Sequence, residues 1–242
     1  QATVQYGYEK DMQIKRVGLD IGITVEERKQ NKNQDVIRKL TDLSTVCPMR
    51  MELDLAHRLT FGYSTTYANQ DGDTITITVG DGLALFSSVH TLTGSASTYS
   101  NALSGNAAFS KGSLENMKKL AVEETLNNLG EKMAMDFDVI WCGDDENTNN
   151  QIDELLNATA NVDSSNAATF NVYKGAARKI RIPLLATTAT GAVDTAKRRY
   201  WGIASTANSS FHLGISEAPF LKTPMDGNNG EDFSTESWNY AA

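Results

Sequence analysis

The sequence predicts an α+β fold, and three features support that prediction. Two stretches, at about 34–60 and 114–129, repeat apolar residues at the spacing of a helix. Several shorter stretches alternate apolar and polar residues with the period of a strand, starting within the first 26 residues. Helices and strands do not follow one another as regular strand–helix–strand repeats, which argues against a regular parallel α/β architecture.

The composition is that of a globular protein. Hydrophobic residues make up 40% of the 242 residues and charged residues 21%, so the chain can bury a sizeable core. No stretch approaches the ~20 apolar residues of a membrane-spanning helix. The net charge of −8 argues against a dedicated nucleic-acid binder, which usually carries a basic patch.

The first 26 residues predict a long hairpin or extended ribbon. Val4, Tyr6 and Tyr8 alternate before a turn at residues 9–11, and a second strand starts near Met12. An isolated two-stranded ribbon is only marginally stable in water, so its apolar face must rest on its own domain or on an adjacent molecule. The second strand alternates with strict period two through Val17, Leu19, Ile21, Ile23 and Val25.

A helix is predicted from about residue 34 to residue 60, with Asn33 as its cap. Apolar residues recur at helical spacing on both sides of Pro48, and Gly62 ends the pattern. Because proline removes a backbone hydrogen bond, we expect a kink or break at Pro48. Two nearly collinear parts would span roughly 40 Å at a rise of ~1.5 Å per residue.

The central part of the chain predicts short strands and one long loop. A turn at residues 69–73 precedes an alternating stretch, Thr74 to Val79, and a glycine-led apolar strand follows at residues 82–86. Residues 91–110 are small and polar with no periodic apolar face, which predicts a long loop.

The second half predicts two more helices among strands. Ser113 is expected to cap a helix over residues 114–129 that Gly130 ends, and a buried strand should follow at residues 137–142. A polar turn at 143–150 should then lead into a short helix containing Ile152, Leu155 and Leu156. Further strands are predicted at residues 179–186, 199–204, 211–215 and 236–240.

The densest acidic cluster is Asp144, Asp145 and Glu146. Oxygen ligands of this kind could hold a divalent cation. The cluster lacks the glycine and the closing glutamate of a calcium loop, however. Acidic residues at the start of a helix complement the helix dipole, and this interpretation fits the cluster better.

No catalytic residue, cofactor site or metal site is predicted. The chain contains no nucleophile elbow, phosphate loop or dinucleotide fingerprint. Its histidines are far apart in sequence, and its two cysteines are expected to be buried free thiols; these residues are His57, His90, His212, Cys47 and Cys142.

One ordered block resembles the major capsid proteins of tailed bacteriophages. It runs from Asp81-Gly82-Leu83-Ala84-Leu85-Phe86-Ser87 through His90 and Gly94 to Ser100-Asn101. Thr91 stands where many members of that family have a proline. Later stretches continue the likeness in the same order, so that it covers roughly residues 50–240; they include residues 171–175, 180–185, 200–204 and 218–220.

The resemblance implies a Hong Kong 97-like capsid fold. On this map, residues 1–26 form an extended arm with a β-hairpin loop. Residues 27–81 and 206–242 form a peripheral domain with its spine helix at about 34–60, and residues 82–205 form an axial domain.

The resemblance also implies self-assembly into hexamers and pentamers of an icosahedral head that encloses double-stranded DNA by confinement, without sequence-specific binding. Such a protein is part of the virion, is assembled in the host bacterial cytoplasm and does not contact a membrane. Portal, scaffold and decoration proteins are further candidate partners. The expected contacts between subunits involve the ribbon residues Val17, Leu19, Ile21, Ile23 and Val25, and axial loops at 144–150 or 163–168, which include Asp144, Asp145 and Glu146.

Three alternatives stay open. An encapsulin-like nanocompartment would share the fold and enclose cargo enzymes, and neighbouring terminase and portal genes would argue against it. A metal-dependent hydrolase would use the Asp144 cluster and would bind calcium, magnesium or manganese in calorimetry. A small-ligand or adhesion module would fit the Ser/Thr/Asn-rich segments and should be monomeric and secreted.

Overall fold

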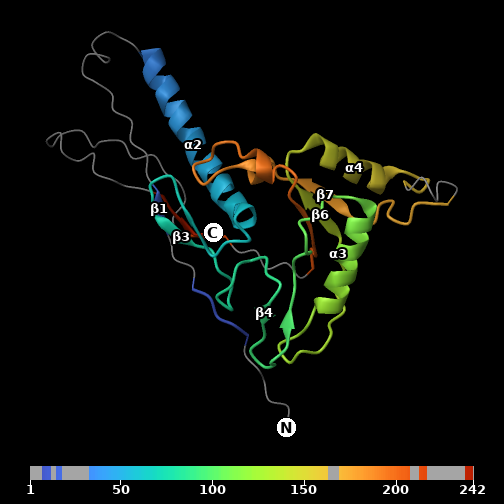
Figure 1. The fold of residues 1–242 in the computed structure, drawn as a ribbon. Helices are drawn as coiled ribbons and strands as arrows, with labels where there is room; N and C mark the ends of the chain where they lie inside the picture. The colour runs from blue at the N-terminus through green and yellow to red at the C-terminus, as the bar shows by residue number, and fades with distance from the viewer. Residues whose placement is uncertain are drawn as a thin grey trace. The chain divides into compact units, whose positions relative to one another are not determined.

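The computed structural model describes residues 7–11, 15–17, 33–162, 169–207, 213–216 and 238–241 (Figure 1). Helices and small sheets are mixed along the chain, which confirms the α+β class. The described residues fall into two units. The first unit draws on residues 1–10 and 56–210, and the second on residues 11–55 and 211–242. The division into arm, peripheral domain and axial domain stays a prediction.

The second unit contains a three-stranded antiparallel sheet and most of a long helix. The strands are β1 (Lys15–Val17), β10 (Trp238–Ala241) and β9 (Gly214–Ile215), in the order β1-β10-β9. Val17 of β1 lies opposite Trp238 of β10. The described part of the predicted ribbon therefore pairs with the C-terminal strand of its own chain. Residues 7–11 form no strand.

Helix α2 (Asn33–Thr60) is a single helix of 28 residues, so the predicted break at Pro48 was wrong. Proline cannot donate a backbone hydrogen bond to the carbonyl four residues earlier, at a cost of about 3 kcal/mol. Leu43 and Cys47 before this position and Ala56 after it are buried, and this packing supports the helix through the proline. The helix ends two residues before Gly62, close to the predicted end.

The first unit is built around the sheet β7-β6-β8. Its central strand, β6 (Val139–Cys142), pairs in parallel with β7 (Arg178–Arg181) and antiparallel with β8 (Trp201–Ala204). Helix α4 (Glu146–Asn157) connects β6 to β7, and Figure 1 shows α3 and α4 beside these strands. The strand predicted at 179–186 ends at Arg181, and a 3-10 turn, η2 (Pro183–Ala186), follows.

The core of this unit lies on one face of the sheet. Ile140 and Cys142 of β6 pack against apolar residues of α3 and α4, and full burial of each such side chain is worth about 1.5–3 kcal/mol. On the other face, the Trp141 ring covers Gly202 of β8, where a Cβ would lie 2.3 Å from the ring. Only glycine fits under that ring. The buried core residues are Phe109, Leu114, Ile140, Cys142, Ile152, Leu155 and Leu156.

Helix α3 (Lys111–Glu124) begins earlier and ends earlier than predicted. Its N-cap is Ser110, and Ser113 is the third helical residue of a capping box in which each side chain bonds the other residue's backbone N–H. Gly130 does not end the helix. It has φ +81° in a tight turn, where its N–H bonds the Asn127 carbonyl.

The remaining short elements partly confirm the predictions. Strands β2 (Thr66–Ala68) and β3 (Thr74–Thr76) form a hairpin around the predicted turn at 69–73. The predicted strand at 82–86 was wrong, because this segment is irregular and turns at Gly82, which has φ +81°. Within the predicted loop, β5 (Thr98–Tyr99) pairs with β4 (His90–Thr91). A second 3-10 turn is η3 (Thr195–Lys197).

Candidate functional site

The acidic cluster marks the start of helix α4, as its sequence pattern indicates. Asp145 is the N-cap, and its carboxylate accepts hydrogen bonds from the Thr148 backbone N–H at 3.0 Å and the Thr148 hydroxyl at 2.8 Å. These bonds hold the pKa of Asp145 below its ordinary value. The polar turn predicted over residues 143–150 is thus mostly helix, since α4 begins at Glu146.

Arginines neutralise this cluster. Asp144 pairs with Arg198 at 3.0 Å, and Glu146 pairs with Arg181 of β7. Arg199 lies 3.8 Å from the Asp145 carboxylate. The carboxylates therefore tie the start of α4 to two neighbouring segments, and pairs as exposed as these are each worth at most about 1 kcal/mol. Within the described ranges, no three His, Cys, Asp or Glu side chains come together as a metal site.

Most of the residues predicted to form ribbon contacts lie outside the part of the chain that the structure describes. Val17 is the last residue of β1, and the other members, Leu19, Ile21, Ile23 and Val25, lie outside the described residues. The axial loop at 163–168 also lies outside them. Of the helices that the structure describes, none is long and apolar enough to span a membrane.

The block that carries the family resemblance is brought together around a buried hydrogen bond between Asp81 and His90. Asp81 Oδ2 lies 2.7 Å from His90 Nδ1, and both side chains are almost completely buried. The Asp81 carboxylate also accepts the backbone N–H groups of Leu83 and Thr91. Burial by itself would raise the pKa of Asp81, but the bonds from His90, Leu83 and Thr91 outweigh burial and lower it.

Asn101 completes this network from the far end of the block. Its side-chain amide donates to the Leu85 carbonyl at 2.7 Å and accepts from the Ser87 N–H at 2.8 Å. His90 Nε2 lies 3.2 Å from the same Leu85 carbonyl, and the His90 ring stacks on Tyr99. His90 and Asn101 therefore hold the irregular segment at residues 85–87 against strands β4 and β5.

An Asp–His pair also occurs in catalytic triads, but this one lacks the third member. In a triad, the second ring nitrogen faces a nucleophile such as a serine hydroxyl. Here His90 Nε2 faces a backbone carbonyl, and His90 is 1% exposed. The pair positions the chain and offers no reactive atom to a substrate.

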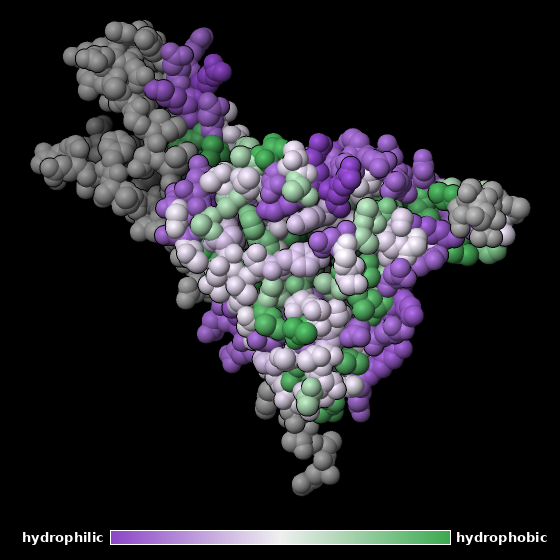
Figure 2. Space-filling model, viewed as in Figure 1, coloured by the Kyte–Doolittle hydropathy of each residue, from purple (hydrophilic) through white to green (hydrophobic). Residues whose placement is uncertain are grey.

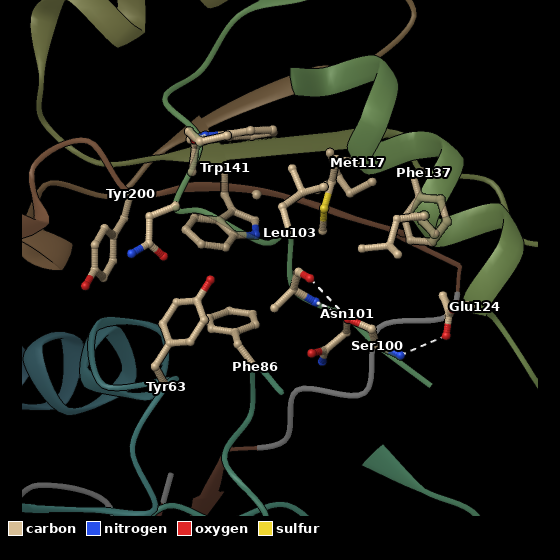
Figure 3. A pocket seen from close by; sticks show the side chains of 18 of the residues that line it. Tyr63, Phe86, Ser100, Asn101, Leu103, Met117, Glu124, Phe137, Trp141 and Tyr200 are labelled. Carbon is tan, nitrogen blue, oxygen red and sulfur yellow. Dashed lines mark hydrogen bonds between the residues drawn. The ribbon is translucent and has the colours of Figure 1, made fainter. Parts of the chain in front are cut away.

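The first unit contains a cleft of about 1120 Å³. Figure 3 shows Tyr63, Phe86 and Tyr200 toward one end and Phe137 and Glu124 toward the other. The Phe86 ring lies 5.2 Å from Tyr63 and 6.0 Å from Trp141, so aromatic faces form much of one wall. Helix α3 forms another wall with Met117, Leu120, Ala121 and Glu124.

Polar groups in the cleft are few and mostly engaged. The Glu124 carboxylate accepts the Ser100 N–H at 3.0 Å. Burial, then the nearby Tyr200, raises the pKa of Tyr63, and burial, then Asp194, raises the pKa of Tyr200. The sequence predicted none of this cleft, because its lining residues come from separate irregular segments with no shared period.

Of the other histidines and cysteines named from the sequence, Cys47, Cys142 and His57 are buried, and His212 lies outside the described residues. Burial raises the pKa of the Cys47 and Cys142 thiols, so both are poor nucleophiles, and both are free, as predicted. His57 is fully buried, and its ring packs edge-on against Phe61 and Tyr67.

Comparisons of the chain with protein-family models, with curated proteins and with solved structures found no match.

Proposed function

We propose that this chain is a shell-building protein of the tailed-phage major capsid type. Its copies form hexamers and pentamers of an icosahedral head that encloses double-stranded DNA. The proposal rests on the ordered resemblance block and on one structural observation: an exposed apolar face at the base of the loop that was expected to reach the ring axis.

That face belongs to two short segments that run antiparallel on either side of residues 163–168. Ala160 pairs with Phe170, and the Asn161 N–H bonds the Thr169 carbonyl at 2.8 Å. Because partners directly opposite each other in an antiparallel bridge point to the same side, Ala160 and Phe170 share one side, and Val162 and Val172 follow two residues further along each segment. All four are exposed, Phe170 to 75%.

The opposite side of the same segment is anchored. Asn171 is buried, and its side-chain amide donates to the Ala158 carbonyl at 3.0 Å. Its backbone N–H bonds the Thr159 carbonyl at 2.9 Å. The apolar side is therefore held outward by fixed hydrogen bonds, and Figure 2 shows hydrophobic surface at this end of the unit beyond α4. Exposed apolar side chains grouped in one short stretch of structure favour association with another molecule.

Other features agree with a structural role. The hydrogen-bond network around Asp81 and His90 holds the fold, and His90 Nε2 faces a backbone carbonyl. Ile37 and Met49 of helix α2 are exposed. Such exposure is expected of a subunit whose apolar surfaces are covered by neighbouring copies. Ring-forming contacts join different surfaces of neighbouring copies and close by rotation, so several separate apolar patches are expected.

The net charge of −8 fits a container. DNA held by confinement needs no basic lining, and strong basic contacts would resist release because phosphate contacts dominate affinity. Portal, scaffold and decoration proteins are proposed as further partners.

The test is electron microscopy of the purified chain and of two charge variants. We expect rings or shells from the wild type, and their loss in Phe170→Asp, because a carboxylate at that position cannot be buried between copies without a cost of several kcal/mol. Val193→Asp is the matched control, since Val193 is equally exposed, at 76%, and lies outside this face. Circular dichroism should show both variants folded.

A wild type that forms no rings or shells would overturn the proposal. If instead Phe170→Asp assembled as well as Val193→Asp, the apolar face would have no role in assembly.

A further inference from the structure

Among the described strands, β8 lies at the edge of its sheet and pairs only with β6. The Gly143 N–H bonds the Tyr200 carbonyl at 2.9 Å, which fixes the alternation of the β6–β8 ladder. Gly202 and Ala204 therefore direct their backbone groups toward β6, while Trp201 and Ile203 direct theirs away from it. In the described part of the chain, no strand pairs with this outer edge.

This edge forms part of the wall of the aromatic cleft. Trp201, Gly202 and Ile203 line it, together with Tyr63, Phe86 and Trp141 on one side and α3 on the other. Free backbone donors and acceptors beside apolar pockets are the features that bind an extended segment as an added strand. The cleft, of about 1120 Å³, has room for an extended segment of polypeptide.

We propose that this cleft accepts an extended segment from a second copy of the chain, which adds to β8 as a fourth strand, and that the donor is the alternating stretch of residues 19–25. The inference rests on the proposed function, since it names the acceptor for a contact between subunits. An exposed edge strand is an aggregation hazard unless it is covered, and a second copy covers it in a defined register.

The donor stretch fits the acceptor in pattern, length and charge. Its sequence, Leu-Asp-Ile-Gly-Ile-Thr-Val, places four apolar side chains on one face. The four residues of β8 span about 13 Å, a length that four or five donor residues cover at ~3.3 Å per residue. The one charged residue of the donor stretch, Asp20, is opposite in charge to the exposed Arg199, which lies at the cleft margin.

The first experiment measures binding of a synthetic peptide of residues 17–26 to the full chain. The peptide has no tryptophan, so the fluorescence of Trp141 and Trp201 reports its arrival in the cleft. We expect saturable binding that is lost when Ile21 and Ile23 of the peptide are both replaced by Asp.

Two protein variants locate the site. Ala121→Glu places a carboxylate inside the cleft beside Glu124 and should weaken peptide binding at least tenfold. Val122→Glu makes the same change at the next residue of α3, which is exposed and outside the cleft, and should leave binding within twofold. No binding by the wild type, or equal binding by both variants, would overturn the inference.

The second experiment measures amide hydrogen exchange before and after assembly. The amides of Trp201 and Ile203 should slow at least tenfold in the shell, while those of Gly202 and Ala204, already paired with β6, should change little. Shells in which the Trp201 and Ile203 amides exchange as fast as in the free chain would overturn this inference and leave the shell proposal standing. Failure of the wild type to assemble would overturn the shell proposal, and peptide binding would then decide the acceptor role alone.

Discussion

At the scale of single residues, Asp81 fixes the path of an irregular segment through several hydrogen bonds. Its carboxylate accepts hydrogen bonds from the Leu83 and Thr91 backbones and pairs with His90. Together with Gly82, which turns with a positive φ, it shapes a segment that forms no strand or helix of its own. A buried charge holds its place only when its partners are intact.

Asp81→Asn should therefore lower the free energy of unfolding by about 2–3 kcal/mol, because a hydrogen bond to a charged group is worth more than one to a neutral amide. Urea unfolding followed by tryptophan fluorescence measures the change. Asp71→Asn is the matched control, as Asp71 is exposed in the β2–β3 turn, and it should shift the free energy by less than about 0.5 kcal/mol. Similar losses in both variants would contradict the role given to Asp81.

The same carboxylate predicts a pH dependence. The pKa of Asp81 is lower in the fold than in the unfolded chain, where it is about 3.9. Its contribution is therefore complete above about pH 4 and is lost as the pH falls through the lower folded value. Between pH 4 and pH 2 the wild type should lose stability more steeply than Asp81→Asn, and parallel curves would contradict this assignment.

The order of residues in the sequence was the only indication that the residues around Asp81 form one group. It marked Asp81, His90 and Asn101 as parts of one block, but nothing in their spacing predicted the contacts with Leu85 and Ser87. Those contacts depend on how an irregular segment folds back, and no periodic pattern encodes such a path. The cleft escaped prediction for the same reason.

At the scale of elements, strong periodic patterns were predicted well and element ends poorly. The apolar stripe of α3 was clear, yet its cap was Ser110 and not Ser113, because two serines three residues apart satisfy the same pattern. The helix at 34–60 was correct in extent, but the proline rule overstated the cost of Pro48 where buried neighbours support the helix. Local capping hydrogen bonds decided the first case, and tertiary packing decided the second.

The capping box of α3 gives a prediction at this scale. Ser110→Ala removes the side chain that accepts the Ser113 N–H and should lower the free energy of unfolding by about 1 kcal/mol. Ser110→Asp keeps an acceptor there and adds a charge that favours the helix start, so it should retain wild-type stability or exceed it. Thermal unfolding measures both, and an equal loss in the two variants would contradict the cap.

At the scale of the whole molecule, the sequence predicted the α+β class correctly, and the proposed function rests on surfaces more than on chemistry. Three residues of the predicted ribbon, Lys15 to Val17, find a sheet partner in β10 of the same chain. The argument that the ribbon needs a sibling molecule therefore applies only to the alternating residues beyond Val17. These residues, the exposed face at Phe170 and the open edge of β8 are the surfaces on which assembly should depend.

A pair of substitutions within the alternating stretch tests that dependence. Ile21→Asp places a charge on its apolar face, while Thr24→Asp places the same charge on its polar face. Because only one face of an alternating strand is buried, Ile21→Asp should yield folded chains and no shells in negative-stain micrographs, and Thr24→Asp should assemble normally. Light scattering should show the Ile21→Asp protein dispersed, because a carboxylate on the apolar face blocks burial against a neighbour and adds repulsion between copies. Normal shells from Ile21→Asp would mean that the apolar face of this stretch is covered within its own chain and that other surfaces assemble the shell.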